Sequence, residues 1–273
     1  MSDSRNALNP APIRVLRITR LALHVAVGLA LSGLAYPFLR ARGRAACFRW
    51  WSRHLLGILR VRVLRRGDAG ATPSGAPVLV LSNHVSWLDV FVIRASIECR
   101  FVAKSEIRQW PLVGWMVGRQ GTVFVQRARR HDTSRVNRTL EDALRSGDRM
   151  AVFPEGTTTD GTEVKPFHGS LLQPLVHAEG YALPVALRYR HEDGRLNADA
   201  TYTGDRSLWD STKLLAAQRE IFVDLTILPP VHAVGRHRRD LAQHCAHAVA
   251  EALNLPVPGS RSGTPAHPPA GTP

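Results

Sequence analysis

The chain has 273 residues, an apolar fraction of 44% and a formal net charge of +14, which is enough for one large α/β domain or two small ones. Residues 1–66 hold thirteen arginines, no lysine and one acid, Asp3, so they carry +12 of that charge. A nucleic-acid-binding domain spreads its basic residues over the folded body. The distribution therefore disfavours nucleic acid as a partner and favours an anionic membrane surface. Three widely spaced cysteines without a C-x-x-C pair disfavour a disulfide framework, and the histidines give no convincing ligand set for a metal.

The first feature along the chain is an uncharged apolar stretch at residues 21–39, flanked by arginines on both sides. As a helix it would cover about 28 Å, close to the hydrocarbon thickness of about 30 Å. A cleaved signal peptide is disfavoured, because the stretch is too long and no A-x-A site follows it. A full transmembrane span and a helix that enters one leaflet and returns both stay open, and the next segment favours the second.

Residues 42–56 form an amphipathic pattern at helical spacing. One stripe contains Arg42, Arg49 and Arg53, and the opposite one contains Phe48, Trp51 and Leu55. Such a helix is typical of the membrane interface; the alternative is a helix that caps the folded core. We predict a membrane-associated helical pair over residues 1–57, a folded body over residues 58–255 on the cytoplasmic side of the membrane, and a disordered tail over residues 256–273.

Apolar strand patterns alternate with helical patterns through the folded body. Strands are expected at residues 58–64, 78–81, 100–103, 122–126, 150–153, 182–190 and 220–228, and helices at 87–97, from 111, at 133–146, 170–179 and 236–253. This alternation predicts an α/β fold with a largely parallel mixed sheet flanked by helices.

A histidine and an aspartate lie where the second expected strand turns into a helix. His84 follows the strand directly, and Asp89 comes one helical turn later, so its carboxylate can reach back to the imidazole. A base and the group that orients it are what is needed to take a proton from a hydroxyl. The H-x4-D spacing alone is common by chance, so its weight depends on the residues around it.

Two further patterns follow strands. Gly121, Phe124 and Arg127 belong to a strand that delivers the arginine to the ligand-binding edge of a sheet, where a guanidinium suits phosphate; a solvated charge cluster is the alternative. The loop with Glu155, Gly156 and Thr157 offers backbone donors and hydroxyls to an oxyanion, or is a simple turn.

Two further observations concern an apolar run with a proline and a motif that the sequence lacks. Pro184, in an apolar run, by itself indicates only a core strand. The sequence has no G-x-S-x-G motif, which disfavours an α/β-hydrolase.

In this order and spacing the four pieces resemble the glycerolipid acyltransferase family, which includes the 1-acyl-glycerol-3-phosphate acyltransferases. The family's blocks are N-H-x4-D, G-x-x-F-x-x-R, F-P-E-G-T and a short apolar block with proline, and the resemblance covers roughly residues 75–190. The chain departs from the pattern after F-P-E-G-T, where many members have Arg and Ser and this chain has Thr158 and Thr159. That departure bears on the recognition of the lipid head group.

The resemblance implies a membrane-bound enzyme that moves a fatty acyl group from acyl-CoA or acyl-acyl carrier protein to a lysolipid hydroxyl, with no bound cofactor. The acceptor it implies first is 1-acyl-glycerol-3-phosphate, which gives phosphatidic acid. His84 would be the general base and Asp89 would fix its tautomer. Membrane lipids and acyl carrier protein are the implied partners.

The resemblance also assigns the substrate contacts. Arg127 would pair with the acceptor phosphate, and Glu155 would hold Arg127 or a glycerol hydroxyl. The residues that would shape the same site are Gly121, Phe124, Gly156, Thr157 and Pro184. Lyso-ornithine lipid or another lysophospholipid is the alternative acceptor. A membrane lipid-binding protein without turnover is the alternative from another class, and the His84–Asp89 pair argues against it, because a binder needs no base.

Overall fold

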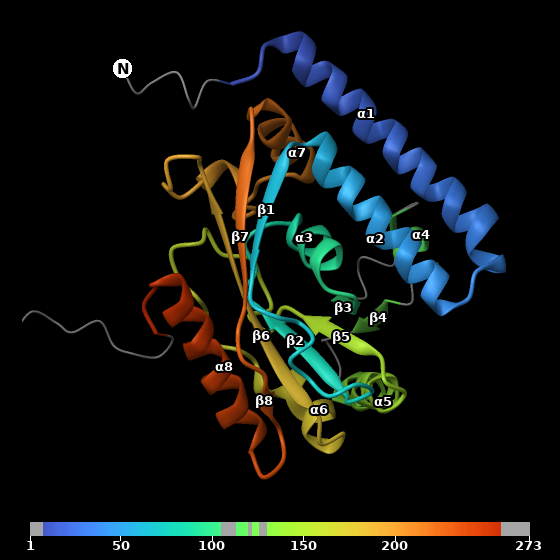
Figure 1. Cartoon of the computed structure of the whole chain (residues 1–273), viewed down its shortest axis with the longest axis vertical. Helices are drawn as coiled ribbons and strands as arrows, with labels where there is room; N and C mark the ends of the chain where they lie inside the picture. Colours follow the sequence, from blue (N-terminus) through green and yellow to red (C-terminus); the bar gives the residue numbers. More distant parts are fainter. Residues whose placement is uncertain (1–7, 105–112, 120–121, 126–129, 258–273) are drawn as a thin grey trace, which may run out of the picture.

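The computed structural model describes residues 8–104, 113–119, 122–125 and 130–257, and its centre is a sheet with helices on both faces (Figure 1). The strands are β1 Val61–Arg66, β2 Val78–Ser82, β3 Arg100–Lys104, β4 Val123–Val125, β5 Arg149–Val152, β6 Tyr181–Arg190, β7 Ile221–Ile227 and β8 Val231–His232. The α-helices are α1 Ala11–Ala30, α2 Ala41–Ile58, α3 Asp89–Ser96, α4 Val113–Arg119, α5 Arg130–Arg145, α6 Gln173–His177, α7 Leu208–Ala217 and α8 Arg238–Leu253. The predicted α/β class is confirmed.

The sheet is mostly parallel, with one reversal of direction. The strand order is β1-β7-β6-β2-β5-β3-β4, and β8 pairs with β6. The strands from β6 to β4 in this order run parallel, whereas β7 is antiparallel to β6 and β1 follows the direction of β7. The carboxyl ends of β2, β5 and β6 therefore lie at one edge, and the first and third motifs both follow a strand at this edge.

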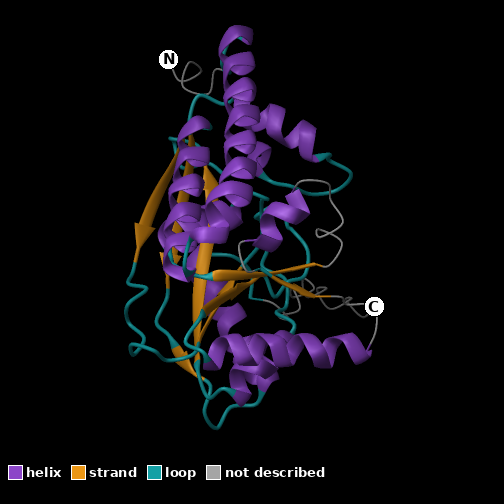
Figure 2. Cartoon of the chain, turned by 90° about the vertical axis from the view of Figure 1, so that its right-hand side faces the viewer, coloured by secondary structure: helices purple, strands orange, loops and turns teal. Residues whose placement is uncertain are grey.

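Each face of the sheet has its own core. Val78 and Val80 of β2 belong to a cluster with α2, α3 and α7, whereas Leu79 and Leu81 belong to a cluster with α5, α6 and α8. This alternation is the period-2 geometry of a strand buried on both faces. Figure 2 shows the helices on the two sides of the strands, and α1 is the outermost of them in Figure 1.

Helix α1 begins ten residues before the apolar stretch, so Arg14, Arg17 and Arg20 lie inside the helix instead of flanking it. Within the described part of the chain, residues Ala11–Phe38 are the one helical segment long and apolar enough to cross a membrane by length and composition. One stripe of α1 is buried against the protein, at Arg17, Leu21, His24 and Gly28. Outward-facing side chains such as Leu23 and Phe38 are 62% and 87% exposed.

The apolar stripe of α2 is buried inside the protein and does not face lipid, which matches the alternative of a helix that caps the folded core. Phe48, Trp51 and Leu55 are 3–5% exposed. The Trp51 ring packs on Phe91 of α3 and stacks on His24 of α1, with centroids 5.6 and 4.6 Å apart. Trp51 Nε1 donates to the His24 carbonyl and His24 Nε2 donates to the Trp51 carbonyl, at 3.0 and 2.9 Å. Helical periodicity shows that a face is apolar, but it does not show whether lipid or protein covers it.

Other boundaries differ from the predicted ones. Helix α2 continues to Ile58 and Arg60 turns the chain with φ of 58°, so β1 starts at Val61 and not at residue 58. The helix expected at residues 170–179 is a 3-10 turn, Gly169–Leu172, followed by the short α6. Helix α7 and strand β8 were not predicted. From residue 258 the predicted disordered tail lies outside the described residues.

Arg17 fixes the first part of α1 to the end of α7. Its side chain is 8% exposed, and its guanidinium donates to the carbonyls of Ala216 and Gln218, and to that of Arg219 at 3.1 Å. These carbonyls follow or end α7, where helical partners run out. Asn9 Nδ2 donates to two of the same carbonyls. The contact ties the outermost helix to the body of the protein.

Replacing Arg17 with Met should lower the free energy of unfolding by about 2 kcal/mol, because the carbonyls lose charge-assisted donors in a buried place. Arg14→Met is the matched control, because Arg14 is exposed on the same helix one turn earlier. Thermal or urea unfolding of the two purified variants in the same detergent measures the difference. Equal stabilities would contradict the structural role of Arg17.

Candidate active site

The turn that carries His84 is fixed to the sheet by Asn83. This asparagine is 1% exposed; its Nδ2 donates to the Leu187 carbonyl at 2.9 Å and its Oδ1 accepts from the Leu187 N–H at 2.8 Å. The amide thus satisfies a backbone donor and a backbone acceptor of β6 just beyond the end of β2. The His84 loop, residues 83–88, therefore leaves the sheet in a defined direction.

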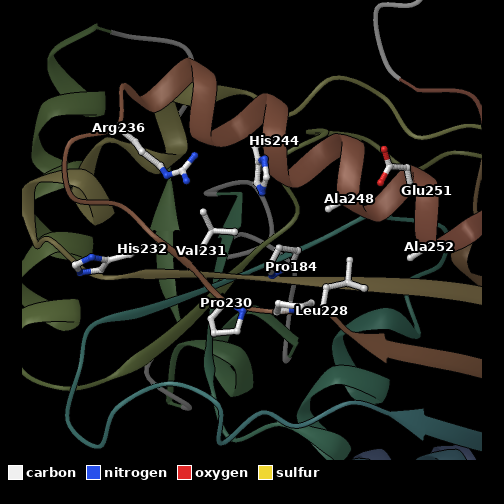
Figure 3. A pocket seen from close by; sticks show the side chains of 11 residues that line it. Pro184, Leu228, Pro230, Val231, His232, Arg236, His244, Ala248, Glu251 and Ala252 are labelled. Carbon is white, nitrogen blue, oxygen red and sulfur yellow. The ribbon is translucent and has the colours of Figure 1, made fainter.

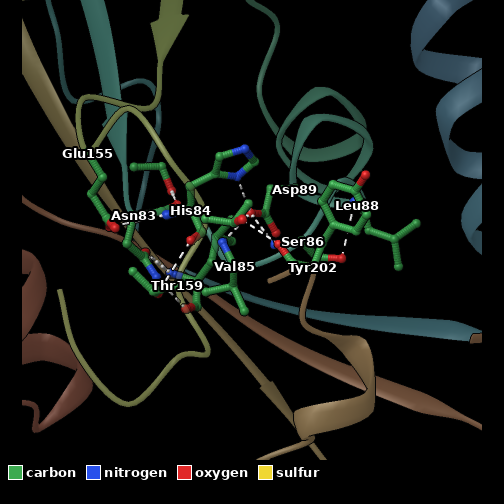
Figure 4. A network of polar contacts seen from close by, with 12 residues as sticks. Asn83, His84, Val85, Ser86, Leu88, Asp89, Glu155, Thr159 and Tyr202 are labelled. Atoms are coloured by element: carbon green, nitrogen blue, oxygen red, sulfur yellow. Dashed lines mark hydrogen bonds and ion pairs between the residues drawn. The ribbon is translucent and has the colours of Figure 1, made fainter. Parts of the chain in front are cut away.

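Asp89 opens α3 and points its carboxylate back into this loop (Figure 4). The residue has no exposed surface. Its Oδ2 accepts from the backbone N–H groups of Val85 and Ser86 at 2.7 and 2.9 Å, and its Oδ1 accepts from the Tyr189 hydroxyl at 2.7 Å. These donors compensate for the burial of the carboxylate.

The predicted contact between His84 and Asp89 is present. His84 Nδ1 lies 2.8 Å from Asp89 Oδ2, and because a carboxylate accepts, Nδ1 carries the proton and Nε2 keeps its lone pair. The imidazole lies flat on the Phe153 ring, with centroids 3.9 Å apart and an 8° angle between planes. Its side chain is 21% exposed, and Nε2 has no hydrogen-bond partner among the described residues. The imidazole is thus held in one orientation and stays partly exposed, as a general base requires.

The loop after β5 holds both backbone groups of His84. Glu155 Oε1 accepts from the His84 N–H at 3.2 Å, and the Thr159 N–H donates to the His84 carbonyl at 2.8 Å. Gly156 has a φ of 78°, the left-handed region that glycine adopts without strain. The third motif therefore contacts the first motif directly, through the main chain of the histidine.

The expected partner of Glu155 was Arg127 or a glycerol hydroxyl, but the contact seen is with the His84 backbone. The Glu155 side chain lies inside the protein, with the residue 4% exposed, and Oε2 has no hydrogen-bond partner in the described structure. Burial raises the pKa of Glu155 to about 8; the N–H groups of His84 and Lys165 oppose the rise, and the charge of Asp89 adds to it. A buried carboxyl with this contact supports the His84 loop.

The second motif is only partly described. Gly121 and Arg127 lie outside the described residues, so nothing places the arginine relative to His84. Phe124 belongs to β4 and is partly exposed, and β4 is separated from β2 by β3 and β5 in the sheet. Thr157 is exposed on the loop that contacts His84.

The structure does not bring Pro184 to the His84–Asp89 pair. It lines a groove of about 610 Å³ between β6, the segment 228–232 and α8 (Figure 3). Along β6, Leu187 and Tyr189 pack with the α3 side of the sheet, whereas Ala182 and Ala186 pack with α8. Pro184 shares the parity of the second set, so its ring and the reacting pair lie on opposite faces.

Sequence reasoning missed the contribution of Tyr189 and the role of Asn83 as a link to β6. Both contacts join residues about a hundred positions apart in the chain. The one available signal was the alternation of the strand pattern at residues 182–190, which places Leu187 and Tyr189 on the same face.

The chain is similar in sequence and in fold to known proteins. The Acyltransferase family profile matches residues 63–188. Over 247 residues the chain is 35% identical to a lyso-ornithine lipid O-acyltransferase from Pseudomonas aeruginosa, and the match covers 88% of this chain and 93% of the relative. The chain belongs to the acyltransferase family. The expected family and enzyme class are confirmed.

Two further similarities concern this acyltransferase. It is 36% identical over 190 residues to a 1-acyl-sn-glycerol-3-phosphate acyltransferase from Neisseria meningitidis, which covers 69% of this chain and 73% of the relative. Its fold is similar to that of the crystal structure of the 1-acyl-sn-glycerophosphate acyltransferase PlsC from Thermotoga maritima. The TM-score is 0.66 at 21% identity, with 89% of this chain and 93% of that one covered. The last likeness concerns the fold alone.

Glu155 makes the stability of the acyltransferase depend on pH. Its pKa is raised from the ordinary 4.5 to about 8, so the folded state holds the proton more tightly than the unfolded state. The stability due to this carboxyl is therefore complete below pH 4.5 and is lost as the pH rises through 8. The unfolding temperature of the wild type relative to Glu155→Gln should fall across this window. Glu163→Gln, exposed in the same loop, is the control and should follow the wild type. If the difference in unfolding temperature between the wild type and Glu155→Gln stays constant with pH, the protonation of Glu155 in the folded state is contradicted.

Proposed function

We propose that this acyltransferase moves a fatty acyl group from a thioester to the free hydroxyl of a lysolipid, with His84 as general base. The observation that carries the proposal is the imidazole whose Nδ1 is held by a buried carboxylate while the ring stays 21% exposed. The names of the relatives, which include acceptors of both the lyso-ornithine and the glycerophosphate type, support a lysolipid as the acceptor.

In the reaction, His84 Nε2 takes the proton of the acceptor hydroxyl as the oxygen attacks the thioester carbonyl carbon. The imidazolium is stabilised by Asp89, whose charge is 2.8 Å from Nδ1. The tetrahedral intermediate collapses by breaking the carbon–sulfur bond. The thiolate then takes the proton from Nε2, so the products are an ester and a thiol and His84 is neutral again. The acceptor is the nucleophile, so no serine or cysteine of the enzyme is acylated.

The donor is acyl-CoA or acyl-acyl carrier protein, since both present the same thioester. Cys99 and Cys245 are buried, and burial raises the pKa of the Cys99 thiol to about 11 and that of Cys245 to about 12. A protonated, buried thiol is a poor nucleophile. This supports direct transfer to the lipid hydroxyl.

Membrane association is supported by the outward face of α1, which is apolar and exposed. Its exposed large apolar side chains are Ile13, Val15, Leu16, Leu23 and Val27. The buried stripe of α1 packs on the body from Arg17 to Gly28, which favours a helix that lies along the bilayer surface over one that leaves the protein to span it. A position on the cytoplasmic membrane with the active site facing the cytoplasm, where acyl thioesters are made, completes the proposal.

For the acceptor, lyso-ornithine lipid is the candidate that the relatives favour. Three lyso-ornithine lipid O-acyltransferases are similar over 87–90% of this chain. Thr158, at the position where many glycerolipid acyltransferases have arginine, binds the Tyr202 carbonyl through its hydroxyl. Residue 158 of this loop thus offers no cation to a phosphate. The second candidate, 1-acyl-glycerol-3-phosphate, is favoured by Arg127 in the second motif.

Replacing His84 with Gln should lower kcat by about 10²–10⁴-fold, the usual contribution of a positioned base. Transfer of a radiolabelled acyl group from acyl-CoA to lysolipid in detergent micelles measures it. His244→Gln, exposed on α8, is the control and should retain full activity. A folded His84→Gln enzyme with near-normal kcat would overturn the proposed role.

Purified enzyme should show a higher kcat/KM for lyso-ornithine lipid than for 1-acyl-glycerol-3-phosphate, with the same acyl-CoA as donor. The reverse order would make the glycerophosphate the acceptor. The Arg127→Ala variant tests whether this arginine binds the acceptor phosphate. Loss of a charge-assisted bond to phosphate should raise KM for the phosphorylated acceptor by about tenfold or more. An unchanged KM would show that Arg127 does not bind that phosphate.

A further inference from the structure

Tyr189 reaches the reacting pair from the part of β6 that extends beyond β2. The last register partners of the two strands are Ser82 and Val185, so Tyr189 lies four residues past the end of the pairing. Its side chain has no exposed surface, and its hydroxyl donates to Asp89 Oδ1 at 2.7 Å. The residue comes directly after the stretch matched by the family profile, which ends at residue 188.

The two oxygens of Asp89 have different partners. Oδ2 accepts from three N–H groups, those of Val85, Ser86 and the His84 ring. Among the contacts of the described residues, Tyr189 is the one donor to Oδ1. Burial, and then the charge of Asp89, raise the pKa of Tyr189 well above its usual range. The phenol therefore keeps its proton and acts only as a donor to the carboxylate.

We infer that Tyr189 is a positioning residue of the acyl transfer, acting on His84 through Asp89. This inference rests on the proposed function, in which Asp89 holds the imidazole for proton abstraction. Two fixed donors, one on each oxygen, set the plane of the carboxylate. The Oδ2 lone pair that meets His84 Nδ1 then points in a fixed direction. Without the phenol, Oδ1 is a buried charged atom lacking a donor, and the carboxylate can rotate to share its N–H partners.

Because Tyr189 is fully buried, it contacts neither the donor nor the acceptor, and its effect should fall on the chemical step. Replacing Tyr189 with Phe keeps the ring in the core and removes only the hydroxyl. We expect kcat to fall by about tenfold or more, the usual weight of a hydrogen bond to a charged group. Both KM values should stay within about twofold, since removing an interaction felt only in the transition state leaves uniform binding unchanged.

The matched control is Tyr181→Phe. Tyr181 begins the same strand, and its ring stacks on His232 at the other end of β6. This variant loses a hydroxyl far from Asp89 and should keep the wild-type kcat. If Tyr181→Phe and Tyr189→Phe lower kcat equally, the inference is overturned.

A double-mutant cycle with Asp89→Asn tests whether the phenol acts through the carboxylate. If it does, adding Tyr189→Phe to Asp89→Asn should lower kcat by less than twofold further, because the effects of residues that act as a unit do not add. A full additional loss would mean that the tyrosine acts independently of Asp89, and the inference would be wrong.

A fluorinated tyrosine at position 189 keeps the test open if the Phe variant does not fold. It retains ring and hydroxyl but makes the hydroxyl a stronger donor, which withdraws charge from the carboxylate that stabilises the imidazolium. We expect kcat to fall by a smaller factor than in Tyr189→Phe, with KM unchanged; an unaltered kcat would overturn the inference. His84→Gln is assayed alongside. If it stays active, the proposed function fails, whereas an inactive His84→Gln with a normal Tyr189→Phe refutes the inference alone.

Discussion

The buried carboxylate of Asp89 is the constraint around which the site assembles. An ionised group without exposed surface is costly unless hydrogen bonds replace its water. Asp89 itself opens α3, and the donors that do so come from the His84 loop and from β6. These three segments must therefore meet at one point. His84 is one of the donors, so satisfying the charge also fixes the tautomer and the direction of the base.

The reversal of strand direction between β6 and β7 explains how a rigid element reaches this point. β2 ends at Ser82, but β6 continues to Arg190, and its last residues pair with β7 instead of β2. Tyr189 and Leu187 therefore lie on a paired strand and not on a loop. One strand end thus supports both sides of His84, through Asn83 before it and Asp89 after it.

The parts of this arrangement that could be predicted were local in the chain. Asn83, His84 and Asp89 follow a strand and open a helix, so their contact depends on seven residues. Glu155 could not be assigned in this way, because its partner is a backbone N–H 71 positions away. Whether Pro184 lies near the His84–Asp89 pair depends on which face of β6 its ring occupies. The register that decides this is set by β2 and β7. Helix α7 had a usable signal, since Ser207 caps it by accepting from the Asp210 N–H, in the S-x-x-D pattern of a helix start.

The outer helices show the same limit: the sequence locates an apolar face but does not identify what covers it. The apolar stripe of α2 was correctly located, but its partner is protein, because Trp51 packs between Phe91 of α3 and His24 of α1. Asp89 opens α3, Phe91 lies two residues later, and α1 presents its apolar face outward. The rings of Phe91, Trp51 and His24 therefore connect α3, the helix that Asp89 opens, to α1. Close-packed interiors do not deform freely, so these contacts hold α1 in a fixed position relative to α3.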